Sequence, residues 1–222
     1  MRGLLLATIV FSGSLFGEES EGETEKWVPL FDGESLTGWT DAQGIEVKEG
    51  RWLAEGGVLI RKEKGAGDLY SSQEYEDFEF SFEWKISAEG NSGVKYRVTA
   101  FEEQFLGLEY QILDDTRHPD GKDKDRRSAA LYDLKAASDA KALNPVGKWN
   151  SSRIIVREGL IQHYLNGALV VEIAIPSAEW EERFAQSKYA QHQGFATKAK
   201  GRLMLQDHGN EVSFRELKIR VY

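Results

Sequence analysis

The chain has 222 residues, 28 Lys+Arg against 37 Asp+Glu, a formal net charge of −9 and no cysteine. This length suits one sandwich or barrel domain better than two domains, and the acidic balance disfavours nucleic-acid binding, which needs a basic surface. Without cysteine there are no disulfides, so a hydrophobic core must stabilise the fold unaided.

The first 26 residues are typical of a targeting segment followed by a charged lead-in. Arg2 precedes a short apolar run at 4–11, and small residues follow it. The run is too short to span a bilayer, so we expect no stable membrane span. We expect 1–17 to be a signal peptide and 18–26 a flexible acidic lead-in, with export to the periplasm or the cell exterior.

From residue 27 onward the pattern predicts short strands separated by glycine turns. The stretch 50–62 ("GRWLAEGGVLIRK") predicts a hairpin that turns at 55–57. The clearest strand is 77–87 ("DFEFSFEWKIS"), in which aromatic and charged residues alternate with period 2. Two further strands, 93–100 and 106–114, are joined by "FEEQF" and predict a second hairpin.

The second half of the chain continues this pattern after a long polar segment at 114–148. Strands at 150–157, 160–165 and 168–175 follow, with an Asn166-Gly167 turn of the type that needs positive φ. One helix is predicted over 177–189, beginning at Ser177. Two closing strands complete an all-β sandwich of two antiparallel sheets with one short helix, spanning 27–222.

The strand "GLEYQILDD" (107–115) carries Glu109 and Gln111 on the face opposite its apolar side. Parity across the predicted hairpin sets Arg97 opposite Glu109 and Lys95 opposite Gln111. A neighbouring guanidinium would lower the pKa of Glu109 and keep it ionised. The alternative is an outward-facing salt-bridge ladder, which these residues alone favour.

Other polar residues are weaker candidates. Gln206 and His208 share one face of "LQDHG", where a strand ends, whereas His163 lies between apolar neighbours and favours a packed structural role. The segment 114–148 is too long for an idle connection and predicts a loop that carries binding groups over a sheet face. Its acids lack calcium-loop spacing, and no zinc cluster or serine triad is present in the sequence.

Several motifs occur together in a fixed order: "WVPLFDGESLTGW", "FEFSFEWKIS", "GNSGVKYR", "GLEYQILDD", "ALYDL", "GKWNSSRIIV", "IQHYLNG" and "LQDHG". They resemble the 3-keto-disaccharide hydrolase domain family over 27–222. The resemblance implies a concanavalin A-like lectin/glucanase jelly roll that cleaves glycosides whose sugar is oxidised at C3, with a small carbohydrate as partner. It specifies no cofactor and no metal ligand. Glu216 stands where the family usually has Asn.

That substrate class implies elimination chemistry with one base, donors for an enolate oxygen, and an acid for the leaving group. We expect Glu109 to be the base, Arg97 with Gln111 or Lys95 to be polarising donors, and His208 or His118 to be the acid. The Arg97–Glu109 pair could instead be purely a binding element. The catalytic candidates are Glu109, His208, His118 and Asp114. The substrate-binding candidates are Asn91, Lys95, Arg97, Gln111, Tyr132 and Gln206.

Two alternatives remain at this point. A lectin-like module of the same fold would bind glycans without cleaving them, because fold alone does not set function. A conventional glucanase would need two carboxylates in an E-x-D-x-x-E strand signature. "EYEDFE" (74–79) approximates that signature but lies at a strand entrance, which indicates a chance match.

Overall fold

A computed structural model describes residues 26–47, 50, 52–62, 65–101 and 104–222. The predicted signal peptide and nearly all of the acidic lead-in lie outside the described residues, so export stays a prediction. Within these ranges no helix has both the length and the apolar character needed to cross a membrane.

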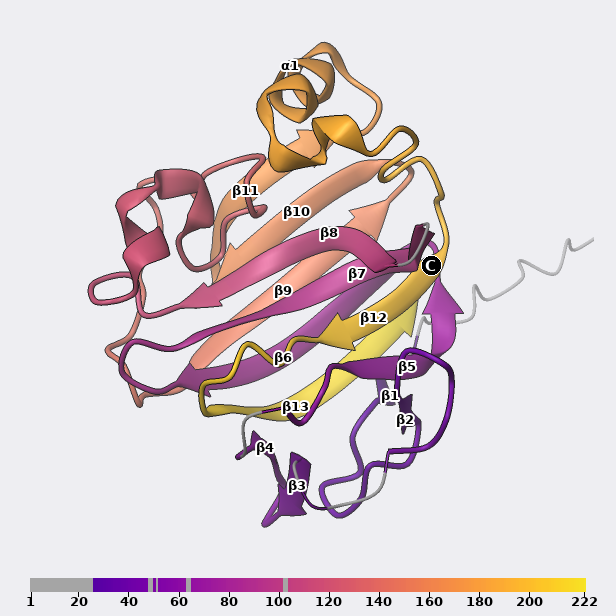
Figure 1. Ribbon diagram of the computed structural model, residues 1–222, viewed down its shortest axis with the longest axis vertical. Helices are drawn as coiled ribbons and strands as arrows, with labels where there is room; N and C mark the ends of the chain where they lie inside the picture. The colour runs from indigo at the N-terminus through magenta and orange to yellow at the C-terminus, as the bar shows by residue number, and fades with distance from the viewer. Residues whose placement is uncertain (1–25, 48–49, 51, 63–64, 102–103) are drawn as a thin grey trace, which may run out of the picture.

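The described strands form two antiparallel sheets packed face to face, which confirms the predicted sandwich (Figure 1). The eight-stranded sheet contains β1 (Val28–Pro29), β3 (Trp52–Glu55), β4 (Val58–Arg61), β6 (Phe78–Ile86), β9 (Asn150–Arg157), β10 (Leu160–Leu165), β11 (Ala168–Ala174) and β13 (Val212–Val221). The five-stranded sheet contains, in spatial order, β2 (Trp39–Thr40), β5 (Leu69–Tyr75), β12 (Gly201–Leu205), β7 (Asn91–Phe101) and β8 (Gln104–Leu113).

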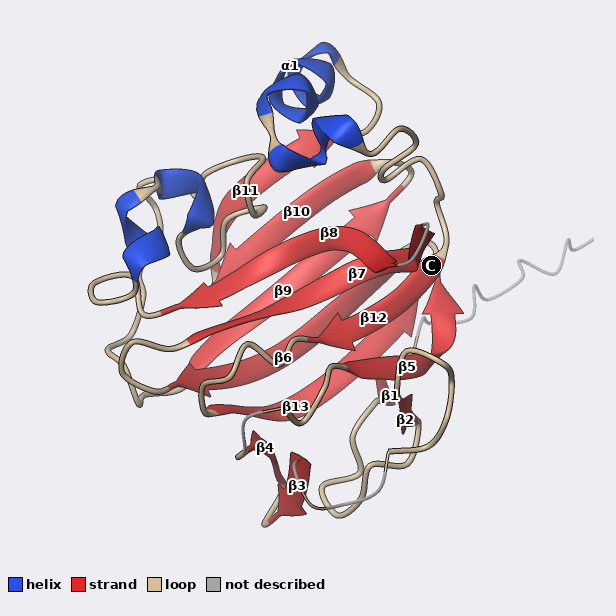
Figure 2. Ribbon diagram, viewed as in Figure 1, coloured by secondary structure: helices blue, strands red, loops and turns tan. Residues whose placement is uncertain are grey.

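Helical segments lie outside the two sheets (Figure 2). The predicted helix is confirmed as α1 (Ala178–Gln186), and the Ser177 hydroxyl accepts a hydrogen bond of 3.1 Å from the amide of Trp180 at its N-terminus. Short 3₁₀ turns are η1 (Pro119–Lys122), η2 (Lys124–Arg126) and η3 (Lys188–Gln191). The turns η1 and η2 lie in the long connection after β8, and η3 lies in the long connection before β12. Both connections bring loop residues toward the five-stranded sheet.

The core forms where the alternating strands of the two sheets face each other. Phe78 and Phe82 of β6 are buried, as period 2 predicts, and their rings contact tyrosines of the other sheet. The ring of Phe82 lies 5.5 Å from that of Tyr110, and Phe78 lies 6.3 Å from Tyr96, both edge to face. Each tyrosine therefore anchors a strand that carries polar residues on its other side.

The two predicted tight turns are confirmed by their backbone angles. Asn166 and Gly167 have φ of 47° and 88° between the paired residues Leu165 and Ala168. Gly56 and Gly57 have φ of 60° and 78° between β3 and β4. Positive φ at both central positions gives the twist that a two-residue hairpin needs.

The predicted register of the β7–β8 hairpin is wrong. Lys95 pairs with Glu109, and Gly93 pairs with Gln111, so neither Arg97–Glu109 nor Lys95–Gln111 is a pair. Two shifts of one residue each cause the difference. Phe101 pairs with Gln104, so the turn is centred half a residue earlier than predicted, and a bulge between Tyr96 and Thr99, where Arg97 takes a φ of 52°, adds one residue to β7. Polar residues still face polar residues, but the partner of Glu109 is displaced by two positions.

A buried polar chain links the two sheets behind this hairpin. The Nδ1 of His163 donates to the carbonyl of Ala129 at 3.0 Å, and its Nε2 accepts from the hydroxyl of Tyr96 at 2.9 Å. The hydroxyl of Tyr110 lies 2.7 Å from that of Ser152. His163 is fully buried, which confirms its predicted structural role. Both bonds suit a neutral imidazole, and burial lowers the pKa of His163 to about 4.

His163 should make the fold sensitive to acid. The unfolded chain takes up a proton as pH falls below the ordinary pKa of 6.5, whereas folded His163 stays neutral until its pKa of about 4. The stabilisation is thus fully present above pH 6.5 and is lost toward pH 4, at about 1.4 kcal/mol per pH unit. We expect His163→Gln to flatten this part of the stability curve, measured by urea unfolding from pH 7 to 5.

His192→Gln, which replaces a histidine outside the core, serves as the matched control and should keep the wild-type slope. Parallel curves for wild type and His163→Gln would show that His163 does not set the acid sensitivity.

Candidate active site

Glu109 projects from β8 onto the outer face of the five-stranded sheet. Its side chain is only 5% exposed, and its Oε2 lies 3.8 Å from the Nζ of Lys95 on β7. The carboxylate also lies above Gly93, where an added Cβ would stand 2.5 Å from Oε1. Gly93 is therefore needed as an open floor, which explains the small residue within "NSGVKYR".

Burial raises the pKa of Glu109, and the positive charges of Lys95, Lys188 and His208 oppose that rise. This corrects the expectation that an arginine lowers the pKa of this carboxyl. Arg97 instead turns away at the bulge, where its Nη2 lies 3.8 Å from Oδ1 of Asp77. A buried carboxylate with a raised pKa is a stronger base than one held by a guanidinium.

Lys188 is a site residue that sequence reasoning missed. It begins η3, and its Nζ lies 4.2 Å from the ring centroid of Tyr132 and 5.0 Å from that of Tyr189. The Lys188 amide donates to Oδ2 of Asp133 at 2.7 Å. Burial lowers the pKa of Lys188, and Glu109 counteracts this shift. The sequence placed Lys188 near the end of the helix predicted over 177–189; in the structure that helix ends at Gln186, and the tertiary packing of η3 brings Lys188 to the site.

Tyr132 reaches the site because the chain segment before it pairs with β8. The amide of Ala129 donates to the carbonyl of Gln111 at 2.8 Å, and the amide of Tyr132 donates to the carbonyl of Glu109 at 3.0 Å. The Tyr132 hydroxyl donates to Oδ2 of Asp120 at 3.5 Å. Burial raises the pKa of Tyr132 to about 12, so the phenol stays protonated. The long loop thus carries a polar group to this sheet, as predicted.

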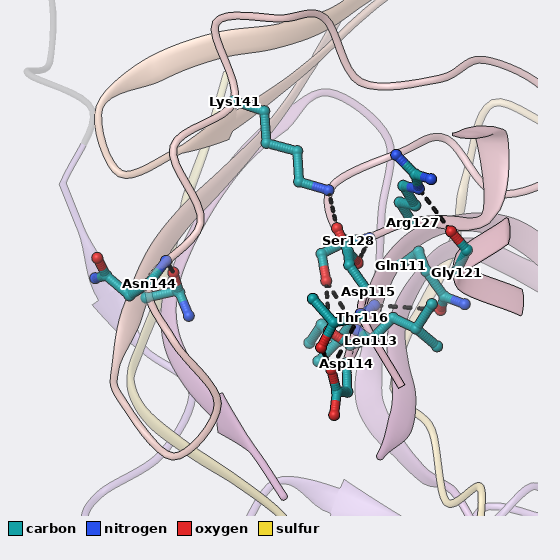
Figure 3. Close-up of polar contacts among 12 residues, drawn as sticks. Gln111, Leu113, Asp114, Asp115, Thr116, Gly121, Arg127, Ser128, Lys141 and Asn144 are labelled. Carbon is teal, nitrogen blue, oxygen red and sulfur yellow. Dashed lines mark hydrogen bonds and ion pairs between the residues drawn. The ribbon is translucent and has the colours of Figure 1, made fainter. Parts of the chain in front are cut away.

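Buried contacts hold the base of this loop in place (Figure 3). The Ser128 hydroxyl accepts from the amide of Leu113 at 2.9 Å and donates to its carbonyl at 2.8 Å. The amide of Ser128 donates to Oδ1 of Asp115 at 2.8 Å, and Lys141 forms an ion pair with the same carboxylate. These bonds fix the position from which Tyr132 meets Glu109.

Asp114 serves this loop rather than the site. Its carboxylate accepts hydrogen bonds from the Glu89 amide at 2.9 Å and the Thr116 hydroxyl at 2.7 Å. Burial opposes ionisation, but these hydrogen bonds outweigh it and lower the pKa of Asp114. Asp114 also follows Glu109 by five residues, about 17 Å along an extended strand. The structure therefore does not bring this catalytic candidate to Glu109.

Two of the candidate histidines lie together at the rim of the site. The rings of His118 and His208 are 6.5 Å apart at their centroids, and His208 acts electrostatically on Glu109. The amide of Asp120 donates to Nδ1 of His118 at 3.2 Å. Both imidazoles come from loops, His118 from the connection after β8 and His208 from the connection after β12.

The loop that carries His208 is held by its neighbour Asp207. The Asp207 carboxylate faces the buried Arg61, with 2.5 Å between Oδ1 and Nε, and accepts from the Gly67 amide at 2.9 Å. The Asp207 amide donates to Oδ1 of Asp68 at 2.8 Å. These contacts place the end of "LQDHG" beside β7.

The three candidate amides differ in their surroundings. Gln111 is buried, and its Oε1 accepts from the amide of Ile112 at 3.2 Å. Oδ1 of Asn91 and Oε1 of Gln206 are buried and have no hydrogen-bond partner among the described residues. The part of the chain that the structure describes contains no group of three or more His, Asp or Glu placed to hold a metal.

A separate cavity of about 650 Å³ lies where the loops after β8 and before β9 meet the end of the sandwich. Its lining includes Trp84, Ile86, Leu143 and Val146, but not Glu109. The cluster of acid, base and cationic side chains is thus on the open sheet face rather than in this cavity.

The structure is thus a two-sheet β-sandwich that carries a buried carboxylate with lysine and histidine side chains around it on one sheet face. Residues 26–220 match the family model described as a 3-keto-alpha-glucoside-1,2-lyase-like domain. The 3-keto-disaccharide hydrolase of Bacteroides thetaiotaomicron is 30% identical over 239 residues, which cover 90% of this chain and 79% of that protein. The chain therefore belongs to the 3-keto-alpha-glucoside-1,2-lyase-like family and is an enzyme of the glycoside hydrolase type.

Solved structures agree with this membership. A protein of Parabacteroides distasonis ATCC 8503 assigned as a glycosyl hydrolase is 29% identical, with a TM-score of 0.80 over 88% of this chain and 94% of its own. A second such protein from that organism is 26% identical, with a TM-score of 0.66 over 89% and 100%. The family confirms the resemblance read from the motifs and favours an enzyme over a lectin-like module.

The pairing of Lys95 with Glu109 predicts how the pKa of Glu109 responds to substitution. Lys95→Met removes the nearest cation, so the pKa of Glu109 should rise further, because less positive charge then offsets its burial. The measurement is a ¹³C NMR titration of the Glu109 carboxyl carbon, assigned with Glu109→Gln.

Arg97→Gln is the matched control for this titration and should leave it unchanged, because Arg97 faces Asp77. A shift with Arg97→Gln and none with Lys95→Met would contradict the observed register.

Proposed function

We propose that this enzyme cleaves the glycosidic bond of 3-keto-disaccharides or related 3-keto-glycosides. The observation that carries the proposal is the buried carboxylate of Glu109 with two ammonium groups around it, Lys95 and Lys188. A buried base among cationic donors suits elimination, whereas a conventional retaining glucanase uses a pair of carboxylates held across the bond. The names of the family and of its Bacteroides relative support the same substrate class.

The first step in this proposal is removal of the C2 proton by Glu109. A ketone at C3 acidifies that proton, and the electron pair moves onto the C3 oxygen as an enolate. Burial favours this step, because a raised pKa brings the strength of the base closer to the operating pH. The ammonium groups of Lys95 and Lys188 would stabilise the enolate oxygen, a role expected from the sequence for Arg97 with Gln111 or Lys95.

The second step is loss of the C1 substituent. The enolate electrons return to form the C1–C2 double bond while the C1–O bond breaks, and the departing oxygen takes a proton from His208 or His118. Water then adds across the double bond, with hydroxyl at C1 and hydrogen at C2. The net result is hydrolysis to a free 3-keto sugar and an alcohol.

Replacing the base tests the proposal directly. Wild-type protein should release 3-keto-glucose from 3-keto-trehalose and leave trehalose intact, because only the oxidised sugar has an acidic C2 proton. Glu109→Gln should lower kcat by about 10²- to 10⁴-fold, the usual contribution of a positioned base, with little change in KM. Product release is followed by chromatography.

The matched control is Glu181→Gln on the exposed face of α1, which should keep full activity. Undiminished turnover by Glu109→Gln would move the base elsewhere, and cleavage of unoxidised trehalose by wild type would reject the elimination route.

The floor of the site gives a second test that leaves every polar group in place. Gly93→Ala puts a Cβ where Oε1 of Glu109 lies 2.5 Å away, so the carboxylate must move. A displaced base should lower kcat/KM by at least about tenfold, because proton transfer depends on position. Thermal unfolding should show a folded protein.

The double variant Gly93→Ala/Glu109→Gln should be no slower than Glu109→Gln alone, since both changes act on one group. Additive losses would indicate that Gly93→Ala acts through the fold and not through Glu109.

A further inference from the structure

Two carboxamides on the strands beside Gly93 have a buried oxygen without a hydrogen-bond partner within the described residues. Asn91 is 3% exposed with its Oδ1 unpartnered, and the buried Oε1 of Gln206 is in the same state. Leaving a buried acceptor unpaired costs free energy, and proteins rarely do so without a reason. Gln111 shows the contrast, because its amide oxygen is used within the strand.

Both amides belong to the face that carries Glu109. Asn91, Gly93 and Lys95 alternate along β7, so they share that face. The amide of Gln206 donates to the carbonyl of Gly93 at 2.9 Å, which places Gln206 directly beside the glycine floor. The carboxylate of Glu109 occupies the other side of the same glycine.

The backbone around both amides is fixed in advance. The Asn91 amide donates to Oδ1 of Asn210 at 3.2 Å, and the Ser92 hydroxyl donates to the carbonyl of Gln206 at 2.9 Å. The two residues thus have anchored backbones and unpaired side-chain oxygens. That combination is expected of a preorganised binding site, because ordering costs are met before the ligand arrives.

We propose that Asn91 and Gln206 bind the hydroxyl groups that flank the ketone of the substrate, at C2 and C4; this inference rests on the proposed function. A carboxamide both donates and accepts, and a hydroxyl group does the same, so the two are chemically matched. The base must reach the C2 proton, so the neighbouring hydroxyls fall beside Gly93. The substrate class is therefore a 3-keto-hexoside with free hydroxyls on both sides of the ketone.

The test uses shape-matched apolar variants, Asn91→Leu and Gln206→Met, in the full chain and in a Glu109→Gln background. Binding of 3-keto-trehalose and of its 2-deoxy, 4-deoxy and 6-deoxy forms is measured by calorimetry in the Glu109→Gln background. Removing the C2 or C4 hydroxyl should weaken binding at least tenfold, and removing the C6 hydroxyl should not. Each variant should bind the parent sugar at least tenfold less tightly and lose the penalty for one deoxy sugar.

Stability of the free protein separates binding from a structural role. Replacing an unpaired buried amide with an apolar group of the same shape should raise Tm, whereas replacing a structural amide lowers it. Gln73→Met, at an exposed position of β5, is the control for the amide-to-thioether change and should leave affinity and Tm unchanged.

Deoxy penalties that persist in both variants, or parent binding that is unchanged, would overturn the inference. Turnover by wild type separates the two levels of the argument. If binding weakens with the C2 or C4 deoxy sugars but the wild type turns nothing over, the proposed function is rejected and hydroxyl binding by Asn91 and Gln206 is kept. If the wild type turns the sugar over but binding does not respond to the deoxy changes, the proposed function is kept and the role of the two amides is rejected. If none of these sugars binds, both are rejected.

Discussion

The close approach of the Glu109 carboxylate to Gly93 is the constraint on which the rest of this structure depends. A charged group can lie flat on a sheet only where the strand beneath it has no side chain. That requirement sets the pairing of Lys95 with Glu109, because the same register puts glycine diagonally beside the acid. The bulge then turns Arg97 away from the residues that alternate with Gly93 and Lys95 on this face, and lysines are left as the cations nearest the carboxylate.

Burial and charge act in opposite directions on this carboxylate. Burial alone would favour the neutral acid, while Lys95, Lys188 and His208 favour the ionised form. Burial strengthens the carboxylate as a base, and the neighbouring cations limit how far its pKa rises. The tyrosine rings around Lys188 contribute by holding an ammonium near the site without a direct salt bridge.

The sequence was sufficient for features that depend on local periodicity. The aromatic alternation of β6, the Asn166-Gly167 turn and the capped helix at Ser177 all follow from short stretches, and the structure contains each of them. It was also sufficient to place Glu109 on an open face. The partner of Glu109 was not predictable, because the bulge has no marker in "YRVT" and register depends on one residue more or less.

Lys188 illustrates a second limit. It comes from a segment far from Glu109 in the chain and meets the site only through packing of the connection before β12. No spacing rule links positions 109 and 188. The approach of Lys188 depends on contacts such as that of Asp133 with the Lys188 amide, which exist only once the loop has folded against β8.

The loop after β8 also affects whether two molecules of this protein can pair through their sheet edges. β8 is the last strand of its sheet, and an exposed edge offers unpaired amides and carbonyls to any passing chain. The segment 129–132 bonds the carbonyl of Glu109 and both backbone groups of Gln111, so this part of the edge is already occupied. The same backbone that presents Tyr132 to Glu109 therefore also guards against edge-to-edge aggregation.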